Sequence, residues 1–161
     1  MSTAQRGDEE ELRDVAACYA RGVDNRDAEL FTSTFHPDGA LELYRAAGQD
    51  EPAERIEGHE ALARVIENIA RYDKTFHFIG QQSFEIDADR ATGEVYCIAH
   101  HLTIAGDEAS NWVMYIRYHD DYIKVGGRWA IALRKVRTEW TALLPARPPR
   151  GRTQASAPKE T

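Results

Sequence analysis

One histidine, His77, stands among large apolar residues in the segment TFHFIG, residues 75–80. The ordinary pKa of histidine lies close to neutral pH, so a neutral imidazole in a dry pocket could remove a proton from a substrate. The alternative is a buried histidine with a purely structural role. The segment alone leaves both interpretations of His77 open.

Two further histidines, His100 and His101, are adjacent in AHHL. In an extended strand they point to opposite faces, so at most one can face an interior. The residues that alternate with His101 are small, as the wall of a cavity requires: Ala91, Gly93, Val95, Cys97 and Ala99. We therefore expect His101 to face inward. No carboxylate or cysteine stands at ligand spacing from the pair, so we expect no metal site.

Asp24, Tyr44 and Tyr19 are candidates with ordinary structural alternatives. Asp24, in GVDNRD, could simply end a helix in solvent. Tyr44, in LELYR, could be strand packing, because aromatic residues favour strands. Tyr19 lies about one helical turn before Asp24 and could face a cavity or pack in the core.

Arg134 is a candidate on the last predicted strand. It alternates with Ala132, Val136 and Thr138. Facing inward, its guanidinium would stabilise negative charge that develops on a substrate or leaving group. Facing outward, it would form a surface ion pair with one of the many acids.

The elements that position these residues follow from the hydrophobic periodicity. Apolar residues recur at helical spacing in residues 8–22 and 58–72. Asp27 is a suitable N-cap for a short helix between them, which is predicted to run through Leu30, Phe31 and Phe35. The segment ALELY, residues 40–44, alternates and predicts a strand. Four longer alternating segments follow: residues 76–86, 91–104, 111–125 and 128–144. Their short connections predict an antiparallel meander, and helices before a long curled sheet predict an α+β fold.

Length and composition limit the class of protein. The chain has 161 residues, enough for one domain, and a formal net charge of -7, which argues against nucleic-acid binding. Cys18 and Cys97 show no metal spacing and suggest free thiols in a reducing compartment. We see neither a signal peptide nor a membrane span, so we expect a cytoplasmic protein without a membrane partner.

With this arrangement the chain resembles the SnoaL-like group of the nuclear transport factor 2-like superfamily over roughly residues 8–143. Within it the likeness is nearest to scytalone dehydratase and hexachlorocyclohexane dehydrochlorinase. Both carry an aspartate just after the first helix and a histidine at the start of the third strand, positions held here by Asp24 and His77. The resemblance implies a cone-shaped α+β barrel, with N-terminal helices packed against a strongly curved, mixed, mostly antiparallel sheet.

The resemblance also implies roles for single residues. Asp24 and His77 would be an orienting carboxylate and a general base, as the logic of catalytic triads suggests. Tyr44 falls where the dehydratase has a water-polarising tyrosine, and His101 falls near its second histidine. Arg134 falls where some dehydrochlorinases carry arginine. The predicted pocket lining is Tyr19, Val95, Cys97, Ala99, Ile116 and Tyr118.

The chain departs from the dehydratase pattern at three positions. Val23 stands where the dehydratase has a second active-site tyrosine. Ile116 and Tyr118 replace a serine and an asparagine on the fifth strand. Because those groups help to recognise the dehydratase substrate, scytalone itself is not the expected substrate.

We therefore expect a cofactor-independent lyase or isomerase acting on a small, mostly apolar cyclic compound, such as a polyketide. The alternative is a non-catalytic ligand-binding or scaffold protein, including a role like that of a dioxygenase beta subunit. We also expect a homo-oligomer, trimer or dimer, formed through an outer sheet face with Tyr96, Ile98, Trp112 or Tyr115. The domain is predicted to span residues 1–144 and a disordered Pro/Arg-rich tail residues 145–161.

Overall fold

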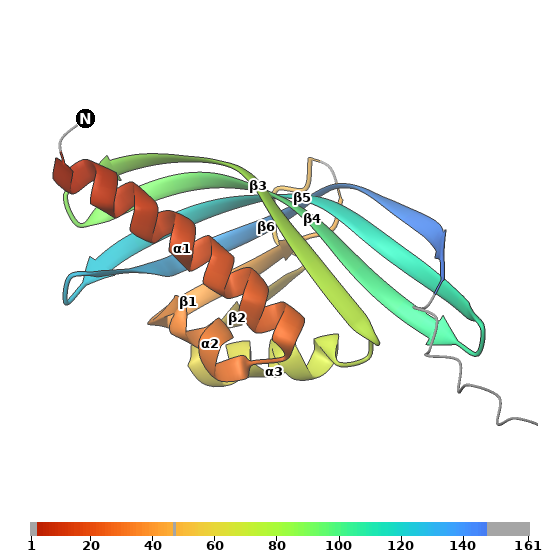
Figure 1. The fold of residues 1–161 in the computed structure, drawn as a ribbon. Coiled ribbons are helices and arrows are strands. Elements are labelled where there is room, and N and C mark those ends of the chain that lie inside the picture. Colours follow the sequence, from red (N-terminus) through yellow and green to blue (C-terminus); the bar gives the residue numbers. More distant parts are fainter. Residues whose placement is uncertain (1–2, 47, 148–161) are drawn as a thin grey trace, which may run out of the picture.

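The computed structural model describes residues 3–46 and 48–147. Three helices and six strands follow one another along the chain (Figure 1). They are α1 (Thr3–Asn25), α2 (Ala28–Ser33), β1 (Phe35–Tyr44), β2 (Glu54–Glu57), α3 (His59–Ile69), β3 (Lys74–Asp87), β4 (Arg90–Ala105), β5 (Glu108–Val125) and β6 (Arg128–Ala146).

The six strands form one sheet in the order β2-β1-β6-β5-β4-β3. Strands β3 to β6 make the predicted antiparallel meander, and β1 runs parallel to β6. The sheet is mixed and open, and its long strands curve around the helices (Figure 1). The predicted α+β class with a curved, mostly antiparallel sheet is confirmed.

Helix α1 covers the inner face of the sheet with an apolar stripe. Its buried residues recur at helical spacing: Leu12, Val15, Ala16, Tyr19 and Val23. Each large side chain of this kind stabilises the fold by about 1.5–3 kcal/mol when it is fully buried. Gly22 lets α2 approach closely, because a Cβ there would lie 2.7 Å from the backbone nitrogen of Phe31.

The N-terminal elements differ in their bounds from the sequence prediction. Asp27 caps α2 as expected, since its Oδ1 accepts a hydrogen bond of 2.9 Å from the backbone N–H of Leu30. Phe35, expected in this helix, instead begins β1. Strand β2 was not predicted, because a four-residue edge strand has too few residues for a visible alternation.

The C-terminal end of the sheet is longer than predicted. Pro145 and Ala146 belong to β6, where Pro145 is paired with Ser110 of β5. The rest of the predicted tail, from residue 148, lies outside the described residues. Within the described part of the chain, Cys97 is a buried free thiol, and every helix is too short or too polar to cross a membrane.

Candidate active site

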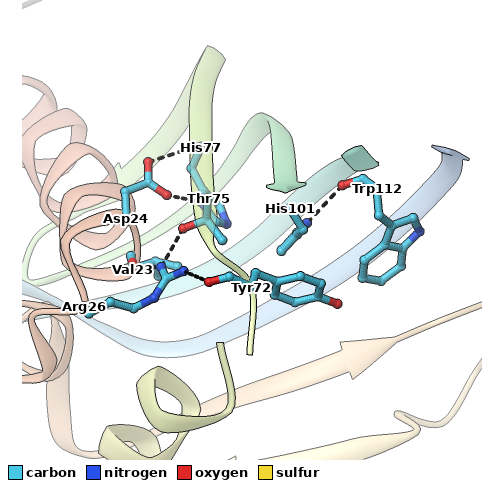
Figure 2. A network of polar contacts seen from close by, with 8 residues as sticks. All are labelled: Val23, Asp24, Arg26, Tyr72, Thr75, His77, His101 and Trp112. Atoms are coloured by element: carbon cyan, nitrogen blue, oxygen red, sulfur yellow. Dashed lines mark hydrogen bonds and ion pairs between the residues drawn. The ribbon is translucent and has the colours of Figure 1, made fainter. Parts of the chain in front are cut away.

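Asp24 and His77 form a hydrogen-bonded pair between the end of α1 and the start of β3 (Figure 2). Nδ1 of His77 lies 2.7 Å from Oδ1 of Asp24, and the backbone N–H of His77 donates to Oδ2 at 2.8 Å. Both carboxylate oxygens therefore contact the same residue, 53 positions away in the chain. The geometry expected for this pair is present.

The end of α1 places Asp24. The helix ends at Asn25, and the next residue, Arg26, has a left-handed backbone with φ 59°. The N–H of Arg26 donates to the carbonyl of Val23, and the N–H of Asp27 donates to that of Gly22. These bonds close the last helical turn, as left-handed caps commonly do.

Strand alternation places His77. Its neighbours Phe76 and Phe78 are 61% and 58% exposed on the opposite face, so His77 turns toward α1. It lies opposite Ala99 of β4, a side chain small enough to leave room for the imidazole. The side chain of His77 is only 7% exposed, and that of Asp24 is 22% exposed.

Asp24 is held in its ionised form. Burial by itself would raise the pKa of this carboxyl, but hydrogen bonds from the ring and backbone of His77 bring it below the usual value. A carboxylate that stays ionised accepts hydrogen bonds and does not donate them. Nδ1 of His77 is therefore the donor in this pair.

His101 is the second histidine of the site and faces inward, as expected. It is buried, and its ring centroid lies 5.8 Å from that of His77. Burial, followed by the nearby His77, lowers the pKa of His101 to about 4. Its Nδ1 lies 3.3 Å from the carbonyl oxygen of Trp112, and a neutral His101 donates there. His100 points to the other face, where its Nδ1 contacts the side-chain amide of Asn111.

The two tautomers set the chemistry that this arrangement allows. Because Nδ1 of His77 donates to Asp24, the lone pair of the neutral imidazole is on Nε2. Within the described residues, no side chain or backbone group hydrogen-bonds to this nitrogen. A neutral imidazole with a free Nε2 and an anchored Nδ1 is the geometry of a general base.

Aromatic residues surround His101. The ring of Tyr72 lies 4.8 Å from His101, and the ring of Trp112 lies 5.2 Å from it. Trp112 was predicted to lie on the outer face, and that prediction is wrong. Trp112 stands directly opposite His101 in the pairing of β4 with β5, and paired residues share one face of a sheet.

Arg134 faces inward but forms an ion pair with another buried residue. Its Nε and Nη2 donate to the two carboxylate oxygens of Asp120 at 2.9 and 2.7 Å, and both side chains are 0% exposed. The rings of Tyr19 and Tyr118 lie 4.1 and 4.3 Å from the guanidinium carbon. Arg134 therefore forms an ion pair with an acid, as in the second alternative, but the pair is buried and not on the surface.

The predicted alternation around Arg134 is partly wrong. The pairing of β5 with β6 shifts between Asp121 and Tyr122, so the core face of β6 passes from Ile131 to Arg134. Ala132 lies in this irregularity and not on the face of Arg134. A bulge inserts a residue and reverses the alternation, which a regular strand pattern cannot reveal.

Tyr44 does not join the site, which corrects the prediction. Leu41 and Leu43 pack toward the core, so Tyr44 points to the other face of β1. There its hydroxyl donates to Glu42 at 2.8 Å, and Arg137 lies over its ring.

The predicted pocket residues all lie inside the molecule. Each is no more than 6% exposed, and all belong to one core cluster: Tyr19, Val95, Cys97, Ala99, Ile116 and Tyr118. Tyr19 and Tyr118 contact each other edge to face at 5.6 Å. Four hollows on the described surface are lined by residues other than Asp24 and His77.

Sequence reasoning missed four residues around the pair: Arg26, Tyr72, Thr75 and Trp112. The alternation of β3 places Thr75 on the same face as His77, so Thr75 could have been predicted from the sequence as a neighbour of His77. Across residues 3–46 and 48–147, no three His, Cys, Asp or Glu side chains gather closely enough to hold a metal ion.

Comparison with known proteins places the chain in a family. The SnoaL-like domain family matches residues 5–135. An uncharacterized protein of Mycobacterium tuberculosis is 26% identical over 139 residues, which are 86% of this chain and 90% of that protein.

Two solved structures share the fold. A candidate scytalone dehydratase from Novosphingobium aromaticivorans superposes with a TM-score of 0.76 at 20% identity, over 96% of this chain and 100% of that one. A type 2 hexachlorocyclohexane dehydrochlorinase superposes with a TM-score of 0.74 at 16% identity, over 97% of each chain. With a family match across most of its length, the chain belongs to the SnoaL-like domain family.

Proposed function

We propose that the protein is a cofactor-independent lyase, dehydratase-like, or an isomerase, in which His77 is the general base and Asp24 its orienting carboxylate. One observation carries the proposal: the 2.7 Å contact between Nδ1 of His77 and Oδ1 of Asp24, which in the neutral imidazole leaves the lone pair on Nε2. The two solved structures named above support a reaction of the elimination type by their fold and printed descriptions.

The chemistry follows from the two nitrogens of His77. Nε2 removes a proton from a carbon that a neighbouring carbonyl or leaving group makes acidic. The imidazolium that forms is stabilised by the Asp24 carboxylate through Nδ1. The proton then passes to a departing hydroxyl, which leaves as water, or to another carbon, which moves the double bond. A positioned base of this kind contributes about 10²–10⁴-fold to the rate.

The surroundings favour a small, mostly apolar cyclic substrate. Ala99 is paired with His77, His101 lies 5.8 Å from the imidazole, and Tyr72 and Trp112 present aromatic rings beside His101. Flat rings pack well against such side chains. Arg134 has no direct role in this scheme, because Asp120 already neutralises its charge.

The test is deuterium exchange, which detects proton removal whatever the later steps are. A panel of cyclic ketones, hydroxylated tetralones and halogenated cyclohexanes is incubated with the protein in heavy water. Mass spectrometry then records deuterium uptake or the loss of water or halide. We expect wild type to react with at least one class, His77→Ala to lose about 10²–10⁴-fold in rate, and Asp24→Asn a comparable factor.

His100→Ala is the matched control, because His100 lies on the outer face and bonds to Asn111. It should keep the wild-type rate. A His77→Ala protein that is folded and reacts at the wild-type rate would refute the proposed base.

A second candidate is a non-catalytic ligand-binding or scaffold protein, including one like a dioxygenase beta subunit. The near-complete burial of the imidazole favours it, since only 7% of the His77 side chain is exposed to an approaching substrate. Binding of panel compounds without any exchange would support this candidate over the enzyme.

A further inference from the structure

We propose that Arg26 is a positioning residue that holds Asp24 in register with His77, acting through Thr75. The proposal rests on the proposed function of the Asp24–His77 pair. Nη1 of Arg26 donates to the hydroxyl of Thr75 at 2.6 Å and to the carbonyl of Val23 at 2.7 Å. Nη2 donates to the carbonyl of Tyr72 at 3.2 Å. Figure 2 shows the guanidinium between the end of α1 and the start of β3.

The backbone of Arg26 suggests that its side chain is needed there. A left-handed conformation costs a residue with a Cβ about 1–2 kcal/mol, and glycine adopts it freely. If this position only had to reverse the chain after α1, glycine would adopt the conformation with a lower free-energy cost. An arginine at φ 59° instead places a long cationic side chain across to β3, 49 residues away. Strain that is retained in this way points to a role of the side chain.

Thr75 connects Arg26 to the pair. A hydroxyl has one proton to donate and two lone pairs to accept with. Arg26 donates to the Thr75 oxygen and, from the same nitrogen, to the carbonyl of Val23, the residue before Asp24. Arg26 therefore holds the residue before Asp24 against Thr75, which lies two residues before His77 on the same strand face, and so keeps the Asp24 carboxylate at Nδ1 of His77.

The competing explanation is that Arg26 only ties the end of α1 to the connection before β3. Both explanations predict some loss of stability when Arg26 is removed. They differ in whether the loss of Arg26 speeds solvent exchange of the Nδ1 proton of His77. They also differ in whether the effects of changing Arg26 and Thr75 on that exchange rate are independent. A readout at the imidazole itself therefore separates them and needs no substrate.

The experiment measures solvent exchange of the Nδ1 proton of His77 by nitrogen-15 NMR of the imidazole ring. We expect Arg26→Gln and Thr75→Val each to speed this exchange by about tenfold, the effect of losing one hydrogen bond to a charged group. The double variant should be no faster than the faster single variant, because both changes break one chain of contacts. Thr75→Ser keeps the hydroxyl and should restore the wild-type exchange.

Arg21→Gln is the matched control, since Arg21 is an exposed arginine in the last part of α1, five residues before Arg26. Thermal unfolding confirms that each variant is folded, and if Arg26→Gln is not, Thr75→Val and Thr75→Ser carry the test. The inference is overturned if folded variants exchange within about twofold of wild type, or if the two effects multiply in the double variant. The proposed function is judged separately, by His77→Ala in the deuterium assay.

Discussion

At the scale of single residues, the site separates one anchored histidine from one that stays neutral. His77 has a carboxylate at its Nδ1, whereas His101 has only a peptide carbonyl. Because the pKa of His101 lies at about 4, it carries no charge at neutral pH. An imidazolium that forms on His77 would therefore meet the Asp24 carboxylate without repulsion from a second cation 5.8 Å away.

The lowered pKa of His101 predicts a pH-dependent stability. Burial, followed by His77, keeps the folded pKa at about 4, whereas the unfolded chain binds this proton at about pH 6.5. Between these values the unfolded state binds more protons, so stability falls as the pH falls. Relative to His101→Gln, wild type should lose on the order of 2–3 kcal/mol of unfolding free energy between about pH 7 and pH 4.

Urea denaturation of both proteins across this range measures the difference. His100→Gln, on the outer face, serves as the control and should follow the wild-type pH dependence. Parallel curves for wild type and His101→Gln would mean that folding does not lower the pKa of His101.

Only part of the residue arrangement could be predicted from the sequence. The inward direction of His77 and His101 follows from strand alternation, which needs no knowledge of distant segments. The bridge from Arg26 to Thr75 joins residues 49 positions apart. Its geometry depends on how α1 crosses the sheet, and no local pattern carries that information.

At the scale of elements, a buried ion pair fastens β5 to β6. Asp120 and Arg134 are opposite each other in the strand pairing, beside the shift where the alternation of β6 reverses. Tyr122 adds a hydrogen bond of 2.6 Å from its hydroxyl to Oδ2 of Asp120. One nitrogen of Arg134, Nη1, is buried without a hydrogen-bond partner among the described residues. The carboxylate is therefore the main compensation for this buried cation.

Asp120→Asn should consequently destabilise the fold strongly. Removing one charge from a buried pair costs about 3–5 kcal/mol, because the other charge stays buried without compensation. Asp120→Asn combined with Arg134→Met should be less destabilised than Asp120→Asn alone, since no unpaired cation remains. Chemical denaturation of the single and double variants tests the order.

The half-exposed pair of Arg117 with Glu94 supplies a control for this experiment. Arg117→Met should change the unfolding free energy by no more than about 1 kcal/mol, as is usual for surface pairs. An Asp120→Asn protein as stable as Arg117→Met would show that the buried pair contributes little.

The element order was predictable, and the pairing of the first strands was not. Short turns between the last four strands specify a meander, because adjacent antiparallel strands need only short connections. The parallel pairing of β1 with β6 joins opposite ends of the chain. It is specified by packing of the whole sheet against α1 and α2, so the alternation in residues 40–44 could indicate a strand but not its neighbour.

At the scale of the whole molecule, apolar residues form a row on the outer face of the sheet. Phe78 pairs with Ile98, Ile98 with Tyr115, and Tyr115 with Trp140, so the row crosses β3, β4, β5 and β6. The rings of Tyr115 and Trp140 stack at 4.5 Å, yet Trp140 is still 59% exposed. Phe76 and Tyr96 lie on the same face and are 61% and 38% exposed.

A continuous apolar surface of this kind favours association, so we predict a homo-oligomer that buries this row, with a trimer preferred over a dimer. Light scattering at micromolar concentration should give a multiple of the chain mass of 18.2 kDa. Phe78→Asp places a charge in the row and should shift the mass toward one chain, because burying an unpaired carboxylate is costly. Val125→Asp is the control, since Val125 is 54% exposed at the end of β5, away from the row. A wild-type mass of one chain, or an unchanged mass in Phe78→Asp, would contradict the prediction.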